Sequence, residues 1–241
     1  MKKILFLVLA LPLSAPGAAG HTKLDSAPID IRDAVSIQRG ARVFANYCLN
    51  CHGAQYMRYN RLMDLGLSER QIRDNLMFAS EKLGDTMNVA LRSRDAAQWF
   101  GTPPPDLSVV ARSRGADWIY TYLRSYYRDA RSTTGWNNLV FENVAMPHVL
   151  WELQGQQRLE VREEEGPDGK HAVKALVLDK PGLLPRSEYD QLVADLVNYL
   201  VFMGEPGQAA RIRIGYVVLI ALGVLFVLFY LLKREYWKDV H

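Results

Sequence analysis

A five-residue motif, Cys48-Leu49-Asn50-Cys51-His52, sets the strongest limit on what this sequence can form. Two cysteines separated by two residues present both thiols on one turn, and a histidine follows at once. This spacing suits thioether bonds to the two vinyl groups on one porphyrin edge, with the imidazole of His52 beneath the iron as an axial ligand. The pattern therefore predicts one haem c, covalently attached through Cys48 and Cys51.

Other uses of a cysteine pair fit less well. The chain has two cysteines, and both lie in this motif. A zinc site needs about four ligands, so it would call for a second pair, and a redox pair would need neither His52 nor Gly53. The net charge of +3 is small, and no basic stripe interleaved with aromatic residues occurs, so no nucleic-acid partner is expected.

The two ends of the chain carry apolar segments. A basic start, a short apolar run and a small-residue stretch predict a signal peptide over residues 1–20, with an uncleaved anchor as the alternative. Near the C-terminus, Ile214–Leu232 is free of charge and would span about 28 Å as a helix, enough for a bilayer. We expect a transmembrane anchor over 211–234. The signal peptide would put the haem domain, 21–207, in the bacterial periplasm and the tail, 235–241, in the cytoplasm.

Helical periodicity predicts two helices that meet. Apolar and small residues over 34–47 form an amphipathic helix that runs into the cysteine motif, with Gly40 and Phe44 on one face. A second helix begins near Ser187, its expected N-cap, and carries Tyr199 on its apolar face. We expect these helices to cross, with Leu196 and Tyr199 against Gly40 and Phe44, because glycine permits close approach.

The sequence between these two predicted helices shows several different patterns. Ser68 can cap a helix that runs to about Ala79, and residues 81–100 carry mixed charges without a clear period, which predicts an irregular loop. The prolines at 103–105 hold the backbone extended. Residues 157–179 alternate apolar and charged side chains around a Gly-Pro-Asp-Gly turn, which predicts an inserted β-hairpin.

Two helices are expected after the prolines. Ser108 or Asp106 can cap the first, which carries Arg112, and the second spans Trp118–Arg128 and carries Tyr126. Haem propionates need hydrogen-bond donors once they are partly buried, and a guanidinium donates twice. Arg112 and Tyr126 are therefore candidate propionate contacts, with a solvated arginine as the alternative.

The sixth iron ligand has several candidates. Met146 lies in a loop of weak helical character, far enough downstream to return over the open haem face. Met57 and Met63 lie so close to His52 that the chain would have to turn abruptly to reach that face. We predict Met146 as the ligand and keep His148 as the alternative, since a second histidine would lower the potential that methionine raises.

The order of these motifs resembles cytochrome c1, the haem subunit of the cytochrome bc1 complex. The resemblance rests on CLNCH near the mature N-terminus, on Pro104-Pro105-Asp106-Leu107-Ser108, on the Met146 loop and on a single C-terminal anchor. It implies a mainly α fold: a class I cytochrome c-like haem domain with a small β-hairpin insertion, plus one C-terminal transmembrane helix. It also implies a set of haem-contacting residues: Cys48, Cys51, His52, Met146, Arg112, Tyr126 and Pro105.

The same resemblance implies electron transfer. The chain would accept an electron from a Rieske iron–sulfur subunit and pass it to a soluble or membrane-bound cytochrome c, within a dimeric complex that also contains cytochrome b. Two features depart from the family pattern. The methionine loop reads Ala145-Met146-Pro147-His148, whereas a small residue between the methionine and a Pro-Pro pair is common in the family, and the 157–179 hairpin has no counterpart that we can place. The alternatives are a free-standing membrane-anchored electron shuttle and a haem-based ligand sensor.

Overall fold

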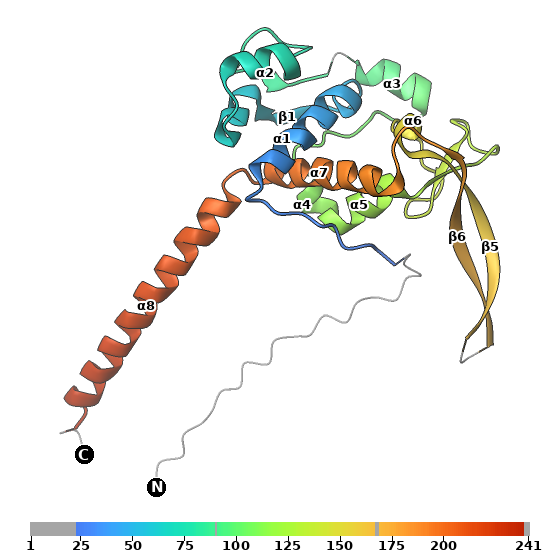
Figure 1. Ribbon diagram of the computed structural model, residues 1–241. Helices are drawn as coiled ribbons and strands as arrows, with labels where there is room; N and C mark the ends of the chain where they lie inside the picture. The colour runs from blue at the N-terminus through green and yellow to red at the C-terminus, as the bar shows by residue number, and fades with distance from the viewer. Residues whose placement is uncertain (1–22, 90, 167–168, 239–241) are drawn as a thin grey trace.

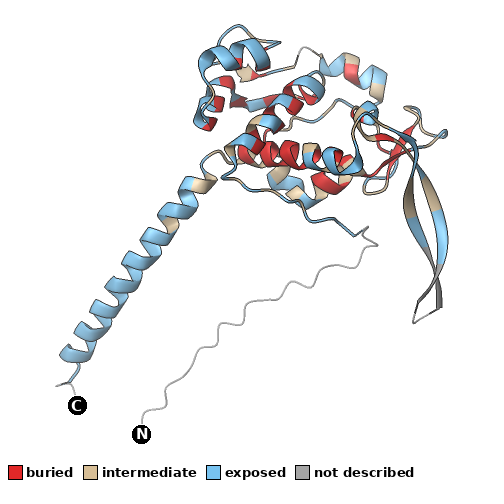
Figure 2. Ribbon diagram, viewed as in Figure 1, coloured by how far each residue is buried: buried red, intermediate tan, exposed pale blue. Residues whose placement is uncertain are grey.

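Two helices from distant parts of the chain form the centre of the molecule (Figure 1). They are α1 (Ala34–Val43) and α7 (Arg186–Gly204). The computed structural model describes residues 23–89, 91–166 and 169–238, and the predicted signal peptide lies outside them. Buried residues concentrate in these two helices and in the elements packed on them (Figure 2).

The two helices cross at Gly40, as predicted. A Cβ atom at this position would overlap the main-chain carbonyl oxygen of Asp195 and lie 2.7 Å from the Cβ of Tyr199. Beside the crossing, the rings of Phe44 and Tyr199 pack with their centroids 5.4 Å apart. Only glycine allows the backbones to come this close, so the crossing depends on residue 40.

The carboxylate of Asp195 joins the two helices. It is 3% exposed and accepts hydrogen bonds from Arg39 Nε at 2.5 Å, from Ser36 Oγ at 2.7 Å and from Gln191 Nε2 at 3.1 Å. Burial alone would raise the pKa of this carboxyl, but the hydrogen bonds from Arg39, Ser36 and Gln191 outweigh burial and hold the pKa below its ordinary value. The fold therefore favours the ionised form.

We expect Asp195→Asn to lower the free energy of unfolding by about 2 kcal/mol near neutral pH, because it removes a charged acceptor from a buried network. The folded pKa lies below the unfolded value of about 3.9, so this contribution is complete above that pH and is lost as the pH falls through the folded pKa. Urea unfolding should show a difference between the two proteins that is constant from about pH 5 to 8 and shrinks below about pH 4.

The matched control is Asp64→Asn. Asp64 pairs with Arg61 at 2.9 Å, but both side chains are about half exposed, so the change should have little effect at any pH. A difference for Asp195→Asn that grows on acidification would contradict the assigned role of the Asp195 carboxylate.

Short elements cover one side of the crossing. In chain order they are a π-helical turn (Phe44–Cys48), β1 (Ala54–Arg58), a 3₁₀ helix (Tyr59–Leu65), α2 (Glu69–Leu76), β2 (Thr86–Met87) and α3 (Ser93–Phe100). Ser68 caps α2, as predicted, and forms a capping box with Gln71, but the helix ends before Ala79. The irregular loop expected over 81–100 is wrong, because β2 pairs with β1 and α3 buries Ala96.

The other side is formed by a second group of short elements: α4 (Val110–Arg114), α5 (Ala116–Arg124), β3 (Tyr126–Arg128), β4 (Trp136–Asn138) and α6 (Trp151–Gln154). The helix predicted over 118–128 ends early. Ser125 turns its hydroxyl back to the carbonyl of Thr121, and Tyr126 pairs with Asn138 in the β3–β4 ladder. Tyr126 therefore lies on a strand and not on the predicted helix.

The predicted hairpin is present and slightly longer than expected. β5 (Gly155–Gly166) pairs antiparallel with β6 (Gly169–Pro181), and the two strands leave the body of the domain as a ribbon (Figure 1). At its base, Gln157 Nε2 donates to the carbonyl oxygens of Arg124 at 3.0 Å and Tyr126 at 2.9 Å. The insertion is thus anchored to the turn between α5 and β3.

The C-terminal part of the chain is helical. α7 starts directly after Pro185 without a side-chain cap, so the N-cap expected at Ser187 is wrong. After Gly204 the chain continues into α8 (Gln208–Tyr236), which contains the expected anchor, 211–234. Within the described residues, α8 is the one helix long and apolar enough to cross a membrane; an 18-residue stretch of it has a mean hydropathy of 2.7, and none of that stretch is buried (Figure 2). The mainly α fold class with a hairpin and a C-terminal apolar helix is confirmed.

Candidate haem site

The cysteine motif follows the first helix without a break. α1 passes into the π-helical turn, where Leu49 N donates to Phe44 O at 3.0 Å, and the amides of Cys51 and His52 then bond to Cys48 O at 3.1 and 2.8 Å. The wider turn and the tight loop after it place both cysteines and the histidine on one short stretch. Both thiols are free. Burial, reinforced by the neighbouring Cys51, raises the pKa of the Cys48 thiol to about 12.

The ring of His52 is fixed by a backbone carbonyl. His52 is 9% exposed, and its Nδ1 lies 2.7 Å from the carbonyl oxygen of Pro105. A carbonyl only accepts, so Nδ1 carries the proton and Nε2 keeps a free lone pair. Burial lowers the pKa of this imidazole, although the Pro105 carbonyl acts in the opposite direction. A neutral ring oriented through one nitrogen, with the other free, is the arrangement of a metal-bound histidine.

The proline segment holds that carbonyl in place by bonding to the residues after the motif. Leu107 N donates to Gly53 O at 2.9 Å. The side chain of Asp106 accepts from Gln55 N at 2.8 Å, and the hydroxyl of Ser108 accepts from Tyr56 N at 3.1 Å. The prediction that Asp106 or Ser108 caps this helix is wrong, since α4 has no side-chain cap. They attach the segment to the chain beyond His52.

The described methionines fall into different environments. Four of them, Met57, Met77, Met87 and Met203, are buried in the main apolar core, and Met63 is 48% exposed. Met146 belongs to neither group. It packs on a second, separate cluster formed by Tyr126, Trp136 and Val144. This separation distinguishes Met146 from the other candidates.

The sulfur of Met146 already has a polar neighbour. The hydroxyl of Tyr122 donates to Met146 Sδ at 3.4 Å and lies 2.6 Å from the hydroxyl of Tyr126. Trp118 stacks on Tyr122 with centroids 4.8 Å apart. Tyr122 also packs against the main core, which includes Cys48. Its side chain therefore lies between the main core and the separate cluster that holds Met146.

His148, the alternative ligand, is packed among aromatic rings. It is 2% exposed, stacks on Tyr126 at 4.6 Å and meets the ring of Trp136 edge-on at 5.1 Å. Burial lowers the pKa of His148 to about 4, against a hydrogen bond from Gln154 that acts to raise it, so the ring is neutral near pH 7. Its Nε2 has no hydrogen-bond partner among the described residues. That free nitrogen is what keeps His148 as the competing ligand.

The two predicted propionate contacts lie in different surroundings. The exposed side chain of Arg112 passes Gly204, where an added Cβ would lie 3.3 Å from Arg112 Cγ. Tyr126 is 1% exposed, and its hydroxyl is taken by Tyr122. Arg114 was not among the predicted site residues, and its guanidinium carbon lies 5.1 Å from the ring centroid of Trp118. The four-residue spacing of Arg114, Trp118, Tyr122 and Tyr126 is the sequence signal that could have pointed to it.

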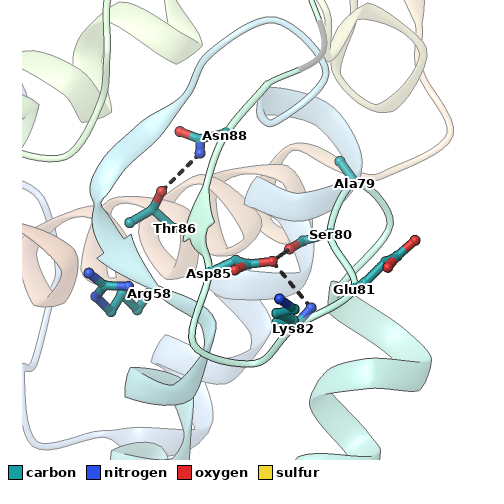
Figure 3. Close-up of a pocket in the computed structure, with 8 residues that line it drawn as sticks. All are labelled: Arg58, Ala79, Ser80, Glu81, Lys82, Asp85, Thr86 and Asn88. Atoms are coloured by element: carbon teal, nitrogen blue, oxygen red, sulfur yellow. Dashed lines mark hydrogen bonds between the residues drawn. The ribbon is translucent and has the colours of Figure 1, made fainter.

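A polar hollow of about 580 Å³ opens elsewhere on the surface (Figure 3). Arg58, Lys82 and Asp85 are among its lining residues, and none of the predicted haem residues lines it. The Asp85 carboxylate accepts from Ser80 Oγ at 2.6 Å and from Lys82 N at 3.2 Å. These two hydrogen bonds hold the pKa of Asp85 below its ordinary value, and the bond from Ser80 has the larger effect. The carboxylate therefore serves to order its own loop.

Comparison with known proteins points to one family. The model of the cytochrome C1 family matches residues 25–160 and 185–240 and leaves out most of the hairpin. A protein of Nitrosomonas europaea named ammonia monooxygenase gamma subunit is 50% identical over the whole of both chains. Cytochrome c1 of Allochromatium vinosum is 49% identical, also over the whole of both chains. Cytochrome c1 of Rhodospirillum rubrum is 30% identical over 86% of this chain and 83% of its own length.

The match to this family implies a haem cofactor and a role in respiratory electron transport. The site described above is suited to that cofactor. Two free thiols, a neutral histidine oriented through Nδ1 and a methionine apart from the main core are all present. The match covers most of the chain, including α1, α7 and α8. The chain belongs to the cytochrome C1 family.

Proposed function

We propose that the chain holds one haem c, attached covalently through Cys48 and Cys51, with His52 and Met146 as axial ligands. The observation that carries this proposal is the 2.7 Å contact between His52 Nδ1 and Pro105 O, which fixes the ring and leaves Nε2 unprotonated. The second support is the position of Met146 outside the main core.

The bound haem supplies a one-electron couple. The residues around the haem set the potential of this couple and its access to water. His52 would hold the iron through a nitrogen whose basicity is raised because the opposite nitrogen bonds to a carbonyl. Met146 would supply a soft sulfur, which favours the reduced state and raises the potential. Tyr122, Tyr126 and Trp136 exclude water from the methionine side, since all three pack in or on its cluster. No bond to a substrate is made or broken.

The proposed partners follow from the family. Cytochrome b and the Rieske iron–sulfur subunit would flank the chain in a quinol:cytochrome c oxidoreductase, which we propose is dimeric. The Rieske subunit donates one electron, and a soluble or membrane-bound cytochrome c accepts it. The chain is then a redox carrier inside an enzyme, and quinol oxidation takes place on the partner subunits.

The proposed topology is a single membrane pass. Residues 1–20 act as a signal peptide, 21–207 form the periplasmic haem domain, 211–234 cross the bacterial inner membrane and 235–241 end in the cytoplasm. The support comes from α8, whose apolar side chains are exposed in the isolated chain. Such a surface requires lipid or a membrane-embedded partner to cover it.

Gentle detergent solubilisation tests this function. We expect the pigment to stay on the polypeptide through denaturing electrophoresis and acid–acetone extraction, and the native polypeptide to migrate with a b-type cytochrome. Replacing both cysteines, Cys48→Ala with Cys51→Ala, should abolish covalent haem, because the chain has no other thiols.

Three results would contradict the proposal. Clean extraction of the pigment would remove the covalent cofactor. Migration of the haem polypeptide by itself would favour a free-standing electron shuttle. Carbon monoxide binding to the reduced wild-type protein at neutral pH would indicate an open sixth position and a ligand sensor.

A further inference from the structure

Two tyrosine hydroxyls and one thioether form a chain of contacts in the second cluster. Tyr126 Oη and Tyr122 Oη are 2.6 Å apart, and Tyr122 Oη is 3.4 Å from Met146 Sδ. A thioether has no proton to donate, so the second contact uses the single proton of Tyr122. The first contact must then use the proton of Tyr126. The hydrogen bonds therefore run in one direction, from Tyr126 to Tyr122 to Met146.

We propose that Tyr126 and Tyr122 act as a directional pair of hydrogen-bond donors that positions the sulfur of Met146 and raises the potential of the haem it binds. This inference rests on the proposed function, in which Met146 is the axial ligand. It also gives Tyr126 a different role from the propionate contact that the sequence implied, because its only hydroxyl proton is already used.

The direction of the effect follows from the electrons on sulfur. A thioether sulfur has two lone pairs, so one can bind iron while the other accepts a hydrogen bond. The hydrogen bond draws electron density away from the sulfur and weakens its donation to the metal. The more positive ferric iron loses more from this than ferrous iron, so the reduced state gains. The bond donated by Tyr126 polarises the Tyr122 hydroxyl and strengthens the effect.

Both tyrosines are held in place by their surroundings. Tyr122 is stacked on Trp118, and its carbonyl accepts from Asn138 Nδ2 at 2.8 Å. Tyr126 pairs with Asn138 across the β3–β4 ladder and stacks on His148. An ordinary phenol titrates near pH 10, so both hydroxyls keep their protons in the physiological range. The pair is therefore available as a fixed donor and not as a proton carrier.

The test is a redox titration, followed by absorbance, of the full-length holoprotein in detergent. Tyr122→Phe should lower the preference of the haem for its reduced state about threefold to tenfold, the size expected for one hydrogen bond. Tenfold corresponds to 59 mV for a one-electron couple. Tyr126→Phe should lower it in the same direction by a smaller amount, because Tyr122 keeps its own donor. The sulfur-to-iron charge-transfer band of the oxidised protein should shift in both variants.

Tyr127→Phe is the matched control. Tyr127 is the next residue on β3 and is also buried, but it pairs with Asn137 and is not a member of the cluster on which Met146 packs. It should leave the potential and the charge-transfer band unchanged. Covalent haem content and helicity, measured for every variant, report on folding separately from the potential.

Two outcomes would overturn the inference. An unchanged or raised potential in Tyr122→Phe with normal haem content would remove the donor role while leaving the haem site intact. A spectrum that Met146→Leu does not alter would remove the axial ligand itself, and the inference would fail with it. The two failures are distinguishable because only the second changes the ligand assignment.

Discussion

Gly40→Ala is expected to lower the free energy of unfolding by about 3 kcal/mol or more, because the added methyl group overpacks the crossing of α1 and α7. The added Cβ would overlap the carbonyl oxygen of Asp195 and lie 2.7 Å from the Cβ of Tyr199. Neither atom can move by itself, since one is main chain and the other is attached directly to it. The helices must separate, which also strains the hydrogen bonds that Asp195 receives from α1.

The measurement is chemical unfolding of the holoprotein in detergent, monitored by helicity and by haem absorbance. Gly84→Ala is the control, because a Cβ at Gly84 meets no atom within 4 Å, and we expect a change within about 0.5 kcal/mol. Since α1 leads directly into the cysteine motif, the Gly40 variant should also carry less covalent haem. Equal stability of the two variants would mean that the close crossing of α1 and α7 does not exist.

The local sequence pattern was sufficient to predict those parts of the fold in which a single residue determines a contact. Gly40 and Phe44 share a helical face, and their partner Tyr199 lies on the apolar face of a second predicted helix, so the crossing was predictable. α3 was missed because its single buried residue is Ala96, and one small apolar residue gives almost no periodic signal. The end of α5 was missed because it depends on the pairing of Tyr126 with Asn138, which is not local.

The candidate site divides in the same way. The residues of the cysteine motif are close together in the sequence, so the haem-binding roles of Cys48, Cys51 and His52 could be predicted from their spacing without knowledge of the fold. The orientation of His52 could not, because Pro105 lies 53 residues further along the chain. The contact of Tyr122 with Met146 likewise joins a helix to a loop 24 residues away. The direction of the Arg112 side chain depends on the end of α7, and only the packed chain reveals it.

Met146→Leu is expected to convert the low-spin haem spectrum to a high-spin one and to lower the potential by on the order of 0.2 V, part of the range of about 0.8 V that axial ligands control. Leucine fills nearly the same volume and should change stability by less than about 1.5 kcal/mol. It has no lone pair, so the sixth position opens. The reduced variant should then bind carbon monoxide, which the wild-type protein should not.

The matched control is Met87→Leu, because the surroundings of Met87 resemble those of Met146. Met87 is buried, and its sulfur accepts a hydrogen bond from Tyr199 at 3.3 Å, much as Met146 accepts one from Tyr122. It lies in the main core beside β1, however, and has no place in the proposed ligand set. If sulfur matters only for packing, the two variants should behave alike. If Met146 binds the iron, only its replacement changes the spectrum, whereas an unchanged spectrum in Met146→Leu would transfer the ligand role to the free Nε2 of His148.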